Sequence, residues 1–75
     1  MDREILAKKI IDLEQRMTER QEKIGATKAK LHFGARDREG TADLEQYLAD
    51  LEAIQDVDRA EHANLIQQWE ALPPA

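Results

Sequence analysis

Apolar residues recur every three or four positions along two long segments of this chain, and this spacing constrains the fold more than any other feature. In the first segment they are Leu6, Ile10, Leu13, Met17, Ile24 and Leu31. In the second segment they are Leu44, Tyr47, Leu48, Leu51, Ile54, Val57, Leu65, Trp69 and Leu72. Steps of three and four residues place side chains on one side of an α-helix. The pattern therefore predicts two amphipathic helices with apolar stripes of the coiled-coil kind.

A short polar break separates the two segments. Gly34 and Gly40 bracket a stretch that includes four charged residues, a composition typical of an exposed turn. We expect Gly34 to end the first helix in a left-handed conformation and Thr41 to cap the second helix. Pro73 and Pro74 end the second helix, because proline lacks the N–H that a helix interior needs. A break this short makes the two helices antiparallel neighbours.

These signals predict an all-α fold, a two-helix antiparallel hairpin of the coiled-coil type. It forms a single domain over residues 1–75, with a helix over about 2–33, a turn at 34–40 and a helix over about 41–72. Two helices alone leave both flanks of their shared seam open to water. We therefore expect the fold to be completed by dimerisation into a four-helix bundle or by docking on another protein.

Folding about the turn brings the two apolar stripes together as a seam. The expected neighbours are Leu6 with Trp69, Ile10 with Leu65, and Met17 with Val57. The residues expected in the seam are Leu6, Ile10, Leu13, Met17, Ile24, Leu31, Leu44, Leu48, Leu51, Leu65 and Trp69.

Two residues interrupt the first stripe. Arg20 stands at a stripe position, where it either forms a buried ion pair with Asp50 or a nearby acid, fixing the register, or lies along the seam edge with its guanidinium in water. We expect the second arrangement. Gly25 costs a helix interior about 1 kcal/mol, and it marks either a close-packing site or a kink.

Charge is divided unevenly between the halves of the chain. Residues 1–40 carry ten bases and eight acids, whereas residues 41–75 carry eight acids and one base, Arg59. We expect an acidic face on the second helix to bind a protein partner with a basic surface, with two apolar residues near the open end of the hairpin as anchors. The candidate partner-binding residues are Asp43, Glu45, Asp50, Glu52, Asp56, Asp58, Glu61, Trp69 and Leu72. Two plainer interpretations stay open: the acids form a solvated face, and the two apolar residues form the last layer of the core.

Catalysis and cofactor binding have no support in the sequence. Cysteine and serine are absent, which removes thiol and serine nucleophiles, disulfides and thiolate metal sites. Neighbouring acids such as Asp43 and Glu45 are two residues apart and diverge on a helix, so they do not form an acid–base pair. His62 shares its helix face with Asp58 alone, which is too few ligands for a metal. We expect no enzyme activity, no cofactor and no bound metal.

Composition also argues against nucleic-acid and membrane binding. The bases of the first helix are interleaved with acids, and the chain has a net charge of −5, so direct binding to DNA or RNA is not expected. No apolar run is long enough to span a bilayer or to act as a signal peptide. We expect a cytoplasmic protein, of its own cell or of a host cell.

Two helical stretches carry a family resemblance. They are residues 20–32, ending in Leu-His, and residues 43–52, where Tyr47 follows Leu44 by three positions. Both resemble the helices of the head–tail joining protein W family of lambda-type phages. The family also has a β-hairpin between its helices, for which the connection at residues 33–40 is too short. The resemblance implies a non-enzymatic virion or prophage component that assembles as a ring.

Three functions fit this architecture. The leading one is a non-enzymatic protein-interaction and assembly module, a homo-oligomer that acts through its apolar seam and its acidic second helix. The second is the phage structural component that the resemblance implies. The third is an acidic inhibitor that imitates nucleic acid and blocks a basic site on a target protein.

Overall fold

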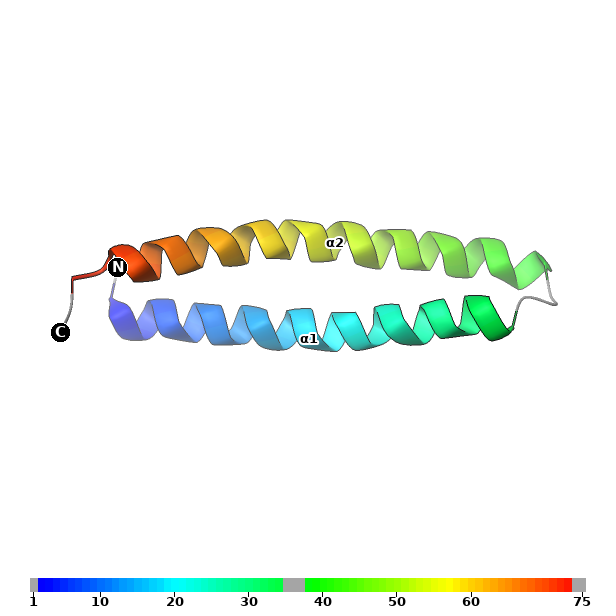
Figure 1. Ribbon diagram of the computed structural model, residues 1–75, viewed down its shortest axis with the longest axis horizontal. Helices are drawn as coiled ribbons and strands as arrows, with labels where there is room; N and C mark the ends of the chain where they lie inside the picture. The colour runs from blue at the N-terminus through cyan, green and yellow to red at the C-terminus, as the bar shows by residue number, and fades with distance from the viewer. Residues whose placement is uncertain (1, 35–37, 74–75) are drawn as a thin grey trace.

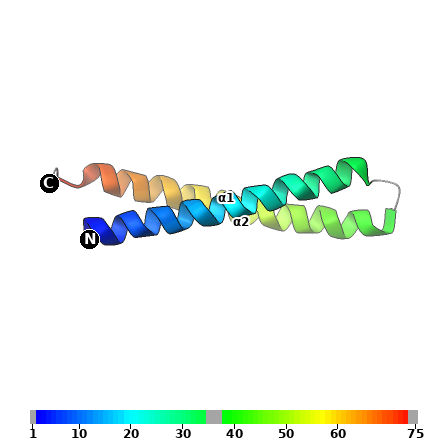
Figure 2. The same cartoon turned by 90° about the horizontal axis from the view of Figure 1, so that it is seen from below.

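The protein is a hairpin of two long antiparallel helices (Figure 1). The computed structural model describes residues 2–34 and 38–73, in which α1 spans Arg3–Phe33 and α2 spans Arg38–Ala71. The helices lie side by side along their whole length and cross at a shallow angle (Figure 2), as helices that pack knobs into holes do. The rod measures 57 × 15 × 14 Å. The all-α helical hairpin predicted from the sequence is confirmed.

Local chemistry sets both ends of α1. Asp2 is the N-cap, and its Oδ1 accepts a hydrogen bond from the Glu4 backbone N–H at 3.4 Å, which satisfies one free N–H of the first turn. Gly34 is the C-cap, and its N–H donates to the Lys30 carbonyl at 2.8 Å. Its φ is −103°, so the prediction of a left-handed conformation is wrong. Glycine is needed there for another reason, since a Cβ would lie 2.7 Å from the Lys30 carbonyl oxygen.

The second helix, α2, begins at Arg38, three residues before its predicted start. Thr41 therefore lies inside the helix, half-buried in the seam, and is not its N-cap. The helix includes Gly40, although glycine costs a helix interior roughly 1 kcal/mol. Residues 35–37 of the predicted turn lie outside the described residues.

Buried side chains follow a strict alternation of three and four residues along both helices, which defines heptad positions a and d. On α1 these residues are Leu6, Ile10, Leu13, Met17, Arg20, Ile24, Thr27 and Leu31. On α2 and directly after its last residue they are Thr41, Leu44, Leu48, Leu51, Gln55, Asp58, His62, Leu65, Trp69 and Leu72. All are buried or half-buried, and they include the eleven residues predicted for the seam, a prediction that is confirmed.

The main apolar core lies at the open end of the hairpin. Its buried residues are Leu6, Ile10, Leu13 and Leu65, and Met17, Ile66, Trp69 and Leu72 pack against them. Leu6 and Leu13 are each 1 % exposed, and burying a leucine side chain completely stabilises a fold by roughly 1.5–3 kcal/mol. This end of the rod therefore holds most of the apolar packing.

Three apolar residues of the predicted stripe on the second helix are exposed instead, namely Tyr47, Ile54 and Val57. Val57, the predicted neighbour of Met17, is 67 % exposed. Gln55 takes its place, and Gln55 Nε2 donates to the Met17 carbonyl at 2.9 Å. The heptad explains the difference, because steps of four and three from Leu51 lead to residues 55 and 58 and leave Val57 one position off the seam.

The first helix continues through Gly25 without a break. No atom from outside its own turn of helix lies within 4 Å of the place that a Cβ would occupy, so Gly25 is not a close-packing site. Thr27 is buried two residues later, and its Oγ1 donates to the Lys23 carbonyl at 2.7 Å, which satisfies the hydroxyl inside the seam. Neither described helix has the length and apolar character that crossing a membrane requires.

Candidate interaction surfaces

A polar layer interrupts the apolar seam near the middle of the hairpin. Arg20 Nη1 contacts the Asp58 carboxylate at 2.5 Å and donates to Gln55 Oε1 at 3.0 Å. The side chains of Arg20 and Asp58 are only 17 % and 12 % exposed. Each charge in this layer therefore has a partner, as charges removed from water require.

The polar layer decides between the two arrangements predicted for Arg20. Its guanidinium lies inside the seam, so the preferred arrangement at the seam edge is wrong. The ion-pair alternative is the one observed, with Asp58 as the partner in place of Asp50. Asp50 is exposed and accepts a hydrogen bond from Gln46 Nε2 at 2.9 Å. Asp50 lies outside the a and d positions, whereas Asp58 occupies one of them.

The acids of α2 do not form a single face. Asp58 is buried in the seam, which removes it from the predicted partner-binding surface. Acids two positions apart point about 160° away from each other around a helix, so the exposed ones divide between the two sides of the seam. Those on one side are Asp43, Asp50 and Glu61, and those on the other are Glu45, Glu52 and Asp56.

The two sides of the seam are two different surfaces of the hairpin. The Ile54 face carries Lys9, Arg16, Lys23 and Lys30 from α1, with Ile5, Asp12, Glu19 and Phe33 farther from the seam, and Asp43, Tyr47, Asp50, Ile54, Val57 and Glu61 from α2. The Ile66 face carries Ala7, Ile11, Glu14, Gln21 and Lys28 from α1, and Glu45, Glu52, Asp56, Arg59 and Ile66 from α2. One hollow is lined by Arg16, Glu19, Arg20, Lys23 and Leu51, and another by residues that include Gln21, Lys28, Glu52 and Arg59. These shared linings show which rows of the two helices adjoin.

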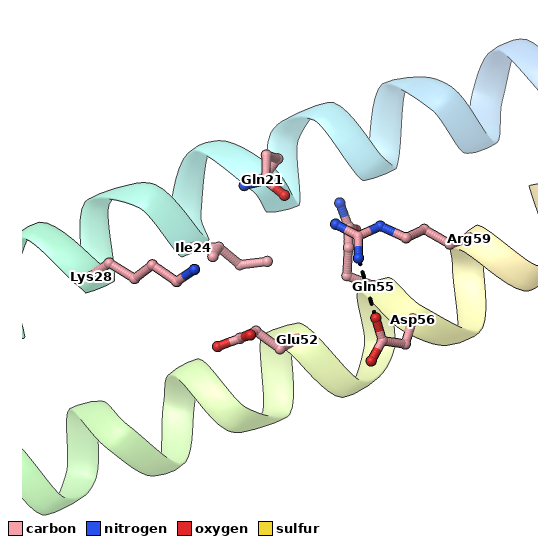
Figure 3. A pocket seen from close by; sticks show the side chains of 7 residues that line it. All are labelled: Gln21, Ile24, Lys28, Glu52, Gln55, Asp56 and Arg59. Atoms are coloured by element: carbon pink, nitrogen blue, oxygen red, sulfur yellow. Dashed lines mark hydrogen bonds and ion pairs between the residues drawn. The ribbon is translucent and has the colours of Figure 1, made fainter.

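The Ile66 face has a small polar pocket beside the polar layer (Figure 3). Side chains from both helices line it, and Arg59 Nη1 pairs there with Asp56 at 3.3 Å. Its volume is about 70 Å³, whereas small-molecule sites usually exceed about 300 Å³. The pocket therefore fits a few water molecules better than a substrate.

An apolar groove lies at the open end of the same face. It has a volume of about 310 Å³ and is lined by Ala7, Ile10, Ile11, Glu14, Ile66 and Trp69. Trp69 and Leu72 are half-buried against the core, so they form its last layer. The guanidinium of Arg3 lies 5.1 Å from the centre of the Trp69 ring, and it donates to the Pro73 carbonyl at 2.8 Å. Trp69 thus packs in the core on one side and borders the groove on the other.

His62 and Asp58 share a helix face, as predicted, but each contacts a different residue of α1. His62 Nε2 lies 3.2 Å from Glu14 Oε2, whereas Asp58 pairs with Arg20. Within residues 2–34 and 38–73, no three histidine or carboxylate side chains come together as a cluster that could hold a metal ion.

The Ile54 face combines two features that the sequence analysis missed. Of the six large apolar side chains exposed in the described part of the chain, five lie on or beside this face, namely Ile5, Phe33, Tyr47, Ile54 and Val57. Four bases of α1 follow one another at intervals of seven residues, and none pairs with a described acid. They are Lys9, Arg16, Lys23 and Lys30. Their seven-residue interval is visible in the sequence, and it is the signal from which this basic row could have been predicted.

Comparison of the chain with protein-family models, with curated proteins and with solved structures gives no match. The resemblance to the phage head–tail joining family, and the ring assembly it implies, therefore stay predictions.

Proposed function

We propose that this protein is a non-catalytic interaction module that acts by self-association. The observation that carries the proposal is the set of large apolar side chains left outside a seam that is already filled. Exposed apolar groups gathered on one surface are typical of sites that bind another protein. A single hairpin leaves both flanks of its seam wet, and a second hairpin covers one of them.

The acidic-inhibitor alternative has weaker support from the geometry. A nucleic-acid mimic needs acids lined up on one surface, whereas those of α2 divide between two sides and Asp58 pairs inside the seam. On the Ile54 face a row of bases runs beside the acids. We therefore assign the exposed acids a role in orienting the partner and not in imitating a phosphate backbone.

Sedimentation velocity at tens of micromolar protein tests self-association. We expect a mass about twice 8.6 kDa, and we expect the larger species to persist in about 0.5 M salt, because apolar burial is not screened as charges are. A mass near 8.6 kDa at both low and high salt would rule out self-association.

A further inference from the structure

The charges of the Ile54 face differ between the two helices. On α1 the row nearest the seam is basic, consisting of Lys9, Arg16, Lys23 and Lys30, and these bases outnumber the two acids farther from the seam, Asp12 and Glu19. On α2 the charged residues of this face are all acidic, consisting of Asp43, Asp50 and Glu61. Among described residues the four bases form no ion pair within the hairpin. The face therefore holds two complementary rows that do not satisfy each other within one copy.

We infer that the Ile54 face binds the same face of a second copy, with both turns at the same end, so that α1 of each copy lies on α2 of the other. This inference rests on the proposed self-association and adds the surface and the orientation. The two-fold axis then runs parallel to the rod, and all neighbouring helices in the bundle are antiparallel, as in common four-helix bundles.

The order of charges along the rod fits this arrangement. The ion pair of Arg20 with Asp58 and the contact of Glu14 with His62 show which levels of α1 and α2 lie side by side. An axis parallel to the rod keeps each residue at its level. Three of the four basic residues then lie within about two turns of helix of an acid on the partner, and long basic side chains span much of that offset. The matched pairs are Lys30 with Asp43, Lys23 with Asp50, and Arg16 with Glu61.

The opposite orientation, with the turns at opposite ends, opposes like charges. It places α1 on α1, where the four bases outnumber Asp12 and Glu19 on both copies, and α2 on α2, where acids meet acids. Juxtaposed like charges across an interface are unfavourable and are a common means of excluding a wrong orientation. Charge thus selects the arrangement with both turns together.

Apolar groups and area supply the attraction. Tyr47, Ile54 and Val57 follow each other along α2 at steps that share a helix side, and the aliphatic stems of the partner's lysines can cover them. The face extends over a rod of 57 × 15 Å, comparable with the roughly 800 Å² per partner of stable interfaces.

A matched pair of substitutions identifies the face. Ile54 and Ile11 are exposed to nearly the same extent, 48 % and 52 %, on opposite faces. We expect Ile54→Glu to raise the dimer dissociation constant at least tenfold in sedimentation, and Ile11→Glu to change it less than threefold. Circular dichroism should show both variants fully helical. Dissociation by Ile11→Glu alone, or by neither, would overturn the assignment of the face.

Charge exchange tests the facing pairs. Lys23→Glu and Asp50→Lys should each weaken dimerisation about tenfold at low salt, and the double variant should return to within about threefold of the wild type. The single effects should shrink in high salt, because exposed charges are screened. If the double variant loses as much dimer affinity as the two single variants lose together, the pairing of Lys23 with Asp50 is overturned.

Spin labels test the orientation directly. The chain has no cysteine, so Lys8→Cys, an exposed position near the open end and away from the seam, gives one label per copy. With both turns together, the two labels lie across the bundle. With the turns at opposite ends, the two labels are also separated along the rod by about 30 Å. A label-to-label distance that includes this separation would overturn the orientation. A monomeric wild type removes the proposed function as well, whereas a dimer that fails these tests removes only this inference.

Discussion

Arg20 of α1 and Asp58 of α2 form an ion pair at 2.5 Å across the seam, with the main core toward the open end and the buried Ile24 and Leu51 toward the turn. Replacing such a pair by apolar groups of similar size is often neutral or stabilising, whereas removing one partner leaves an uncompensated charge. The pair therefore contributes more to alignment of the two helices than to stability, because sliding either helix separates both charges from their partners.

We expect Arg20→Met to lower the free energy of unfolding by roughly 2–3 kcal/mol, since it strands the Asp58 carboxylate in a mostly buried place. Adding Asp58→Leu should restore or exceed the stability of the parent protein. Urea unfolding followed at 222 nm measures both. Lys8→Met is the control, because Lys8 is exposed, lies away from the seam and makes no ion pair with a described residue. A double variant no more stable than Arg20→Met contradicts the argument.

Leu13→Asp should abolish the cooperative unfolding transition. Leu13 is 1 % exposed within the main core. The substitution loses the several kcal/mol of stability that a buried leucine provides, and it also buries an unpaired charge. A domain of this size has little more stability than that. Gln15→Asp, at an exposed position of the same helix, should unfold as the wild type does. An unchanged thermal transition for Leu13→Asp would disprove the seam.

Gly25→Ala should stabilise the hairpin by about 0.5–1 kcal/mol. Its added methyl group enters open space, and alanine loses less backbone entropy than glycine when a helix forms. The shift in the urea midpoint at constant m-value measures the gain. Destabilisation would instead indicate that this position needs glycine, for example for contact with a partner.

Gly34→Ala should have the opposite sign, with a loss of more than about 1 kcal/mol, because the new Cβ would lie 2.7 Å from the Lys30 carbonyl oxygen. Both substitutions add one methyl group, at Gly25 inside α1 and at Gly34 in its C-cap, so each is the control for the other. Equal effects at both positions would contradict the close approach at the C-cap.

Local signals predicted the two helices well, except for the start of α2 and the conformation of the C-cap of α1. Apolar spacing located both helices and all eleven predicted seam residues. A threonine followed by an acid is a good cap and predicts that α2 starts at Thr41, yet the helix begins at Arg38. At Gly34 the position of the cap was right and its conformation was not.

The polar part of the seam was harder to predict, because apolar residues at 54 and 57 compete with Gln55 and Asp58 for the stripe. Judged by hydrophobicity, Val57 belongs inside and Asp58 outside. Judged by an unbroken heptad from Leu51 to Leu65, the assignment reverses, and the structure follows the heptad. Register along a long helix depends on all its layers together, so one polar layer is accommodated by pairing.

The sequence by itself determined two helices, the turn between them and the stripe on which they meet, because these follow from spacing, glycine and proline within single segments. Only the tertiary structure decided which charges are inside. Arg20 lies in the seam because Asp58 and Gln55 reach it from the other helix, whereas the basic row of α1 forms no ion pair with a described acid. Pairing across a seam depends on the relative level of two helices, which neither helix encodes alone.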